Sequence, residues 1–224
     1  MPTVLPFEDV SFGPPAVRGF LHRPEAPSGE ALVLTHGAGG NARAPLLAAV
    51  ADAFAERGVT VLRCDLPFRQ ARPKGPPSPG SAARDRQGLA HAVSALRRLA
   101  PGRMSLGGHS YGGRQASMLV AGERDLVDAV LLLSYPLRPP GRAEVRTDHF
   151  PELRTPTFFV HGSTDVFGTI AELDAARALI PAPTRLLALE GARHDLYQGR
   201  PGPEAARLIA LRIAGEFQAW SCSI

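Results

Sequence analysis

Gly108-His109-Ser110-Tyr111-Gly112 has the form G-x-S-x-G and lies between two segments with different structural preferences. The apolar run Met104-Ser105-Leu106 before it is typical of a strand, and the small-residue pattern from Gly113 to Ala121 predicts a helix after it. A tight turn between a strand and a helix requires small flanking residues and leaves the serine hydroxyl projecting at the N-terminus of the helix. The helix dipole and the free backbone amides there favour negative charge on a nearby substrate oxygen. The stretch therefore predicts that Ser110 is a nucleophile.

Strand patterns alternate with helical patterns along the rest of the chain. Strands are predicted at residues 16–22, 31–35, 59–64, 104–106, 129–134, 157–160 and 185–189, and helices at 42–57, 81–99, 113–121, 170–180 and 204–220. Segment 129–134 is almost wholly apolar, as expected for a central parallel strand. This alternation predicts an α/β fold, a three-layer sandwich with a mostly parallel central sheet and helices on both faces. We expect residues 1–224 to form a single domain with little or no lid.

Two proline- and glycine-rich segments, 67–80 and 134–156, each follow a predicted strand and are expected to be loops. In an open parallel sheet the C-terminal strand ends form the ligand crevice, so we expect these loops to rim it. Such short rims predict a shallow site that prefers small acyl groups. The first loop carries Arg69, Arg72 and Lys74, which could attract an anionic substrate. A solvated basic loop is the simpler interpretation of these three side chains.

A serine hydroxyl is a poor nucleophile without a base, and seven histidines are candidates. His194 is favoured because it follows the last predicted strand in Glu190-Gly191-Ala192-Arg193-His194, where glycine gives the backbone freedom. His149, in segment 134–156, is the alternative. Other histidines are expected to be structural or to point away from the substrate side of the turn, namely His22, His91 and His109.

The base needs an acid that fixes its tautomer and stabilises the imidazolium ion. Asp165 follows the predicted strand 157–160 through His161-Gly162-Ser163-Thr164, again at a C-terminal strand end. Three separate strand ends therefore supply Ser110, Asp165 and His194, an arrangement that is much harder to obtain by chance than one motif. Asp148 and Asp195 remain alternatives for the acid.

The segment His36-Gly37-Ala38-Gly39-Gly40 follows the predicted strand 31–35, and its small residues allow close approach to a substrate. It predicts an oxyanion hole made by the backbone amides of Ala38 and Tyr111. A rival interpretation is a dinucleotide-binding loop, because residues 37–42 fit G-x-G-x-x-G/A and Asp65 ends the next strand. That aspartate lies further on than the usual spacing of about 20 residues. The rival also leaves Asp165 and His194 unexplained.

Composition limits the remaining function classes. The 224 residues carry a formal net charge of +4, and hydrophobic residues make up 44% of them. Lys74 is the only lysine, and no basic block or arginine-rich helix face supports nucleic-acid binding. Cys64 and Cys222 lack metal-ligand spacing and are expected to be ordinary reduced thiols. No signal-peptide pattern or membrane-length apolar run is present, so we expect a cytoplasmic protein without a membrane partner.

These motifs resemble the α/β-hydrolase superfamily, in which a serine, an acid and a histidine follow one another in this chain order. Segments 65–69 and 135–141 are similar to a subgroup of small, nearly lidless bacterial serine hydrolases. That subgroup is itself similar to dienelactone hydrolases and to a eukaryotic chromatin-complex subunit, the NSL complex subunit 3. The resemblance implies Ser110 as nucleophile, His194 as base and then acid, and Asp165 as the orienting acid. Dienelactone hydrolases carry cysteine at the turn, so Ser110 argues against that activity.

We expect a serine hydrolase that cleaves small carboxylic esters or thioesters through an acyl-enzyme on Ser110, without a metal or organic cofactor. Its partner would be the small-molecule substrate, and the sequence does not predict an oligomeric state. The similarity to a chromatin-complex subunit raises an alternative, a non-catalytic protein-binding module with the same fold. The presence of all three residues of the predicted site argues against it, since no binding role requires all three.

Overall fold

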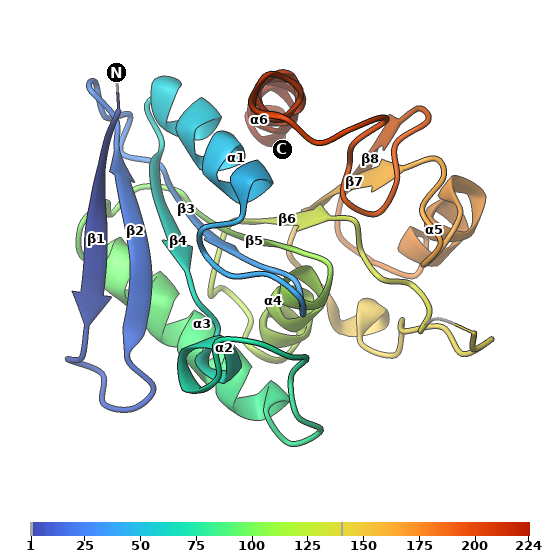
Figure 1. Ribbon diagram of the computed structural model, residues 1–224, viewed down its shortest axis with the longest axis horizontal. Coiled ribbons are helices and arrows are strands. Elements are labelled where there is room, and N and C mark those ends of the chain that lie inside the picture. Colours follow the sequence, from blue (N-terminus) through green and yellow to red (C-terminus); the bar gives the residue numbers. More distant parts are fainter. Residues whose placement is uncertain (1, 140) are drawn as a thin grey trace.

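An eight-stranded sheet forms the centre of the computed structural model, which describes residues 2–139 and 141–224 (Figure 1). The strands lie in the order β1-β2-β4-β3-β5-β6-β7-β8. Strands β3 to β8 are mutually parallel, and β2 runs antiparallel to both β1 and β4. Their bounds are β1 Thr3–Asp9, β2 Val17–Arg23, β3 Ala31–Thr35, β4 Thr60–Cys64, β5 Met104–His109, β6 Ala129–Leu133, β7 Thr157–Gly162 and β8 Thr184–Leu189. Met1 and Pro140, within the predicted domain and the predicted loop 134–156, lie outside the described residues.

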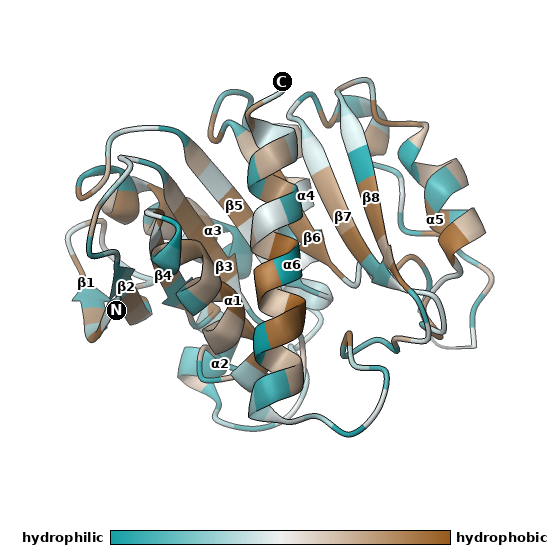
Figure 2. Ribbon diagram, turned by 90° about the horizontal axis from the view of Figure 1, so that it is seen from above, coloured by the Kyte–Doolittle hydropathy of each residue, from teal (hydrophilic) through white to brown (hydrophobic). Residues whose placement is uncertain are grey.

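Helices cover both faces of the sheet (Figures 1 and 2). Helices α1 (Pro45–Glu56) and α6 (Pro203–Ser221) pack against each other on one face. Helices α3 (Ala82–Arg97), α4 (Tyr111–Gly122) and α5 (Ile170–Arg177) lie on the other, with the short helices α2 (Pro67–Ala71) and η1 (Phe150–Glu152). The predicted three-layer α/β architecture is therefore confirmed. No helix in the described part of the chain is long and apolar enough to cross a membrane.

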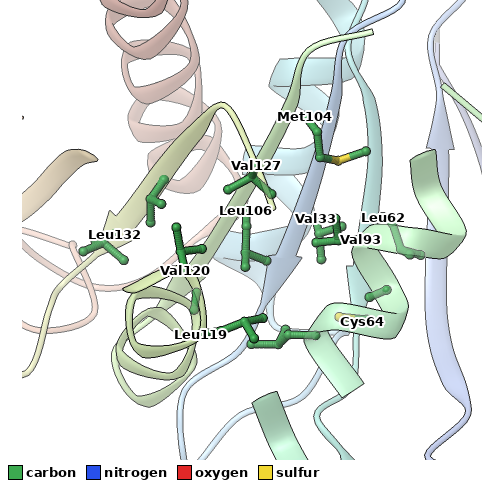
Figure 3. Packing of buried hydrophobic residues seen from close by; sticks show 14 of the residues in the cluster. Val33, Leu62, Cys64, Val93, Met104, Leu106, Leu119, Val120, Val127 and Leu132 are labelled. Atoms are coloured by element: carbon green, nitrogen blue, oxygen red, sulfur yellow. The ribbon is translucent and has the colours of Figure 1, made fainter. Parts of the chain in front are cut away.

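Alternating side chains of the central strands pack into two apolar cores, one on each face of the sheet. Val33, Leu106 and Leu132 point toward α3 and α4 and are almost fully buried there (Figure 3). Leu34 and Leu131 point toward α1 and α6. Strands β3 and β6 are buried along their whole length, which explains their unbroken apolar sequences.

The predicted element boundaries differ from the observed ones in three instructive places. Strand β1 was not predicted, because its residues are largely exposed and Pro6 interrupts the pattern. Helix α1 begins at Pro45 rather than at residue 42, since proline is favoured in the first helical turn. The predicted loop 67–80 begins with helix α2, so the expectation of a loop throughout was wrong for Pro67–Ala71.

Candidate active site

Ser110 lies on a strained turn between β5 and α4. Its φ and ψ angles are 50° and −116°, in a region where non-glycine residues are rare. A Cβ atom at Gly108 would lie 2.7 Å from the Gly112 carbonyl carbon, and one at Gly112 would lie 2.4 Å from the His36 oxygen. The two glycines of the motif are therefore required by close backbone approach. Strain of this kind costs about 1–3 kcal/mol and is concentrated at functional sites.

The structure brings Ser110, His194 and Asp165 into one hydrogen-bonded chain. The distance from His194 Nε2 to Ser110 Oγ is 2.8 Å, and the distance from His194 Nδ1 to Asp165 Oδ2 is also 2.8 Å. Parallel strands carry all three residues to the same edge of the sheet, because each follows the C-terminal end of β5, β7 or β8. Both distances lie within hydrogen-bond reach, and the one between His194 and Ser110 is short enough for proton transfer.

Asp165 and His194 are held in place by neighbours that the sequence did not single out. The Asp165 side chain is fully buried, and its Oδ1 atom accepts a hydrogen bond from the Phe167 amide at 2.9 Å. The Phe167 ring lies against the His194 ring with the centroids 4.1 Å apart. His161 Nε2 lies 3.7 Å from Asp165 Oδ2 and 2.8 Å from the Gly168 oxygen. These contacts restrict both side chains to one rotamer.

His109 also contacts His194. Its Nε2 atom lies 2.8 Å from the backbone oxygen of His194, and the two rings are 5.2 Å apart. Burial lowers the pKa of His109 to about 4, so the neutral ring donates its Nε2–H to that oxygen near pH 7. The prediction that His109 points away from the substrate side was wrong, because it also lines the cavity beside Ser110.

The loop after β3 lies directly against Ser110. A Cβ atom at Gly37 would come within 3.3 Å of Ser110 Cβ. The Gly37 oxygen accepts hydrogen bonds from His36 Nδ1 at 2.8 Å and from the Gly40 amide at 3.0 Å. Because the carbonyl and the amide of a trans peptide point in opposite directions, the Ala38 amide is directed away from these partners. Tyr111 is the first residue of α4, so its amide has no partner within the helix.

Arg69 fixes this loop from behind. Its Nη2 atom donates to the Ala38 oxygen at 2.8 Å, and its Nε atom donates to the Gly40 oxygen at 2.8 Å. The same guanidinium also binds the carbonyl oxygens of Arg72 and Gly75. Arg69 is 6% exposed, so the interpretation of 69–74 as a solvated basic loop was wrong for this residue. Its guanidinium group donates hydrogen bonds to backbone carbonyl oxygens and does not line the cavity.

Two further side chains connect the site to the fold. His36 is fully buried, its Nε2 atom accepts a hydrogen bond from the Leu66 amide at 3.1 Å, and burial lowers its pKa. Asp85 is also fully buried and accepts hydrogen bonds from the Tyr111 hydroxyl at 2.7 Å and from the Phe68 amide at 2.9 Å. His36 therefore connects the loop after β3 to Leu66, just before helix α2. Asp85 connects Tyr111, at the start of α4, to Phe68 of α2.

A cavity of about 1030 Å³ opens beside Ser110 and His194. Its walls come from residues 36–52, 109–110, 167 and 194–207, and they are mainly apolar. The prediction that segments 67–80 and 134–156 rim the site was wrong for this cavity. The cavity is large for a ligand pocket, since ligand pockets range over about 300–1,000 Å³, and the expectation of an open, shallow site stays a prediction.

The alternative site residues lie elsewhere. His149 Nε2 is 2.8 Å from Ser117 Oγ, and burial lowers the pKa of His149 to about 4. Asp148 is exposed, and Asp195 lies at the cavity but accepts a hydrogen bond from the Tyr197 amide at 3.2 Å. Asp65, the acid of the dinucleotide interpretation, accepts a hydrogen bond from the Ala42 amide at 2.7 Å and so fixes the end of the loop after β3.

No three His, Cys, Asp or Glu side chains among residues 2–139 and 141–224 are grouped as a metal site would require. Asp85 and Phe167 are site residues that the sequence analysis did not name, whereas Arg69 was named there for a different role and His36 only as the first residue of the segment 36–40. Arg69 and Phe167 follow a strand end by a few residues, which was the available signal. Nothing local marks Asp85, whose partners are 17 and 26 residues away.

Comparison with known proteins assigns this chain to a family. The model of the alpha/beta hydrolase domain matches residues 28–216. A search of curated proteins returned no match. Among solved structures, the dienelactone hydrolase of Anabaena variabilis superposes with a TM-score of 0.76 at 20% identity, over 97% of this chain and 98% of that one.

Two other solved structures share the fold at similarly low identity. Est1E from Butyrivibrio proteoclasticus superposes with a TM-score of 0.73 at 17% identity, covering 98% of this chain and 99% of that one. An α/β serine hydrolase without a lid, from Xanthomonas campestris, gives a TM-score of 0.67 at 14% identity over 98% and 94% of the two chains. With its family model spanning most of the sequence, the chain belongs to the alpha/beta hydrolase domain family.

Proposed function

We propose that the protein is a serine hydrolase that cleaves carboxylic esters or thioesters through an acyl-enzyme on Ser110. The observation that carries the proposal is the chain of 2.8 Å contacts from Ser110 Oγ through His194 to the buried Asp165 carboxylate. A hydroxyl, a base and an orienting acid in this order are the parts that acyl transfer through serine requires.

In the acylation step, His194 Nε2 removes the Ser110 proton as Ser110 Oγ forms a bond to the substrate carbonyl carbon. The carbonyl π electrons move to the oxygen, and the amides of Ala38 and Tyr111 stabilise that oxyanion. The carbonyl then re-forms, the ester C–O or thioester C–S bond breaks, and His194 gives its proton to the leaving alcohol or thiol.

In the deacylation step, a water molecule takes the place of the leaving group. His194 removes one proton from the water as its oxygen attacks the acyl carbon, and the oxyanion forms again. The acyl–Oγ bond breaks, Ser110 recovers the proton from His194, and the carboxylic acid leaves. Asp165 holds the Nδ1–H tautomer of His194 through both steps and stabilises its cationic form.

Three kinds of observation support the reaction class. The strained turn presents Ser110 at the start of α4, where developing negative charge is stabilised. The Gly37–Ala38 peptide is oriented by His36, and each oxyanion donor is typically worth about 10²–10³ in rate. Solved proteins with this fold include a dienelactone hydrolase and Est1E with bound ferulic acid.

A small-molecule substrate and a cytoplasmic location are parts of the proposal.

Intact mass after treatment with a fluorophosphonate tests this function. Wild-type protein is expected to gain one adduct, and the Ser110→Ala variant none. Ser117→Ala is a matched control, since Ser117 also lies 2.8 Å from a histidine but is fully buried in α4; it should label like wild type. A folded wild-type protein that takes no adduct would contradict an activated Ser110 and favour the non-catalytic binding module.

A further inference from the structure

The cavity beside Ser110 extends as an apolar groove between the N-terminal halves of α1 and α6. Along α1 its lining includes Pro45, Ala48, Ala49 and Asp52, which are spaced i, i+3, i+4 and i+7 and so share one face of the helix. Along α6 the lining includes Pro203, Ala206 and Arg207, again on one face. The same cavity contains Ser110, so the groove is continuous with the proposed nucleophile.

Side-chain size explains why the groove is open at this end. Near the C-terminal end of α1, Phe54 packs edge-on against Phe217 of α6, with ring centroids 5.6 Å apart. The cavity lining includes the small residues Ala48, Ala49 and Ala206 beside Leu46 and Leu47, and the short alanine side chains leave space between two helices whose spacing the large rings set. Residues 194–203 complete the wall on the side of the loop after β8.

Charged residues mark the far end of the groove. Asp52 is 41% exposed and binds His22 Nδ1 at 2.8 Å. Arg207 is 58% exposed and binds Glu56 at 2.9 Å. Asp52 is hydrogen-bonded to a histidine that burial keeps neutral near pH 7, and Arg207 is ion-paired, so the apolar floor of the groove ends at a solvated, charged rim.

We propose that this groove binds the acyl chain of the substrate, and that the preferred substrate carries an unbranched aliphatic acyl group of about eight to ten carbons. The inference rests on the proposed function and names its substrate class. It replaces the sequence-based expectation of small acyl groups.

The length follows from helix geometry. Pro45 and Asp52 are seven residues apart, which corresponds to about 10.5 Å along the axis of α1. An extended alkyl chain advances about 1.25 Å per bond, from a bond length of about 1.52 Å and a bond angle of about 111°. About eight bonds therefore span the part of the groove that α1 lines, from Pro45 to the charged rim at Asp52, and we expect further methylenes to leave the groove.

Burial of methylenes sets the expected effect on rate. A fully buried CH₂ raises kcat/KM by about fourfold, and a half-buried one by about twofold. From butanoyl to octanoyl esters, kcat/KM should rise by about 15- to 250-fold. From decanoyl to tetradecanoyl esters it should stay constant within about threefold, because the added carbons remain in water.

The first experiment measures kcat/KM for p-nitrophenyl esters from acetyl to tetradecanoyl with the wild-type enzyme, below the concentrations at which the esters aggregate. Ala48→Phe should fill the groove and remove the rise from butanoyl to octanoyl, while p-nitrophenyl acetate is still hydrolysed. Ala219→Phe is the matched control, because Ala219 is exposed near the C-terminal end of α6, outside the groove. A flat or falling series in wild type, or an unchanged series in Ala48→Phe, would overturn the proposal.

A binding measurement separates this inference from the proposed function. Decanoic acid should bind Ser110→Ala in isothermal titration calorimetry, and the Ser110→Ala/Ala48→Phe double variant should lose at least about tenfold in affinity. If no ester is hydrolysed and no fluorophosphonate adduct forms, the proposed function fails while this titration still tests the groove. Absence of decanoate binding to Ser110→Ala would overturn the groove assignment.

Discussion

Arg69 offers the sharpest test of how the loop that carries the proposed oxyanion donor Ala38 is held. Replacing it by glutamine removes a buried guanidinium that donates to four carbonyl oxygens, including those of Ala38 and Gly40 at 2.8 Å. Glutamine is shorter and has one donor group, so it cannot reach the Ala38 and Gly40 oxygens together. The Ala38–Gly39 and Gly40–Asn41 peptides, which follow the Ala38 amide in the chain, then lose the contacts that fix their orientation.

The expected magnitude follows from the value of one oxyanion donor. Complete loss of the Ala38 amide would cost about 10²–10³ in kcat. The Gly37 oxygen remains bound by His36, so the loop keeps part of its geometry, and we expect kcat to fall by about 10- to 100-fold. KM should change by less than about threefold, because the amide acts mainly in the transition state.

The assay is hydrolysis of p-nitrophenyl acetate, with kcat and KM determined separately and unfolding followed by circular dichroism. Each carbonyl left without a donor costs about 1–3 kcal/mol, so the melting temperature should fall as well. Arg69→Lys serves as the comparison, since it keeps the charge but lacks the planar fork and should recover little of kcat. Unchanged kcat in a folded Arg69→Gln variant would refute the role of Arg69 in positioning the loop.

Two other predictions concern the acid and the buried histidines. Asp165→Asn should lower kcat on p-nitrophenyl acetate by about 10³–10⁴, because the neutral amide favours the wrong His194 tautomer; Asp195→Asn on the neighbouring loop should stay within about threefold, and a comparable loss there would move the acid. Burial lowers the pKa of His22, His109 and His149 to about 4, whereas an unfolded histidine titrates near about 6.5. The unfolded chain therefore takes up protons first as the pH falls, so stability is complete above about pH 6.5 and is lost progressively toward about pH 4. Equal free energies of unfolding in urea at pH 7 and pH 5 would contradict this sign.

Residues with a local sequence signal were predictable. Ser110 lies within a five-residue motif, and Asp165 and His194 each follow an apolar strand whose C-terminal end can be recognised from its composition. In a parallel sheet those ends meet at one edge, so the sequence alone could predict that the three side chains lie close together. The catalytic roles assigned to them remain predictions that the labelling and kinetic experiments test.

Residues that act through backbone contacts were not predictable. Arg69 donates to carbonyl oxygens 29 and 31 residues away, and a carbonyl group has no sequence identity that a pattern could reveal. Composition alone suggested a solvated loop there, because arginine is usually exposed. Asp85 was missed for a similar reason, since one of its two partners is a backbone amide.

The walls of the cavity were not predicted because the loops were taken as its rim. Segments 67–80 and 134–156 looked like a rim in the sequence, yet part of the cavity wall comes from α1 and α6. Such a space depends on how large and small residues are matched between two helices that are about 150 residues apart in the chain. Phe54 and Phe217 set the separation at one end, and Ala48 and Ala206 do not fill it at the other. Because that difference in size is encoded in pairs of distant residues, the acyl preference can be inferred only after the two helices have been placed side by side.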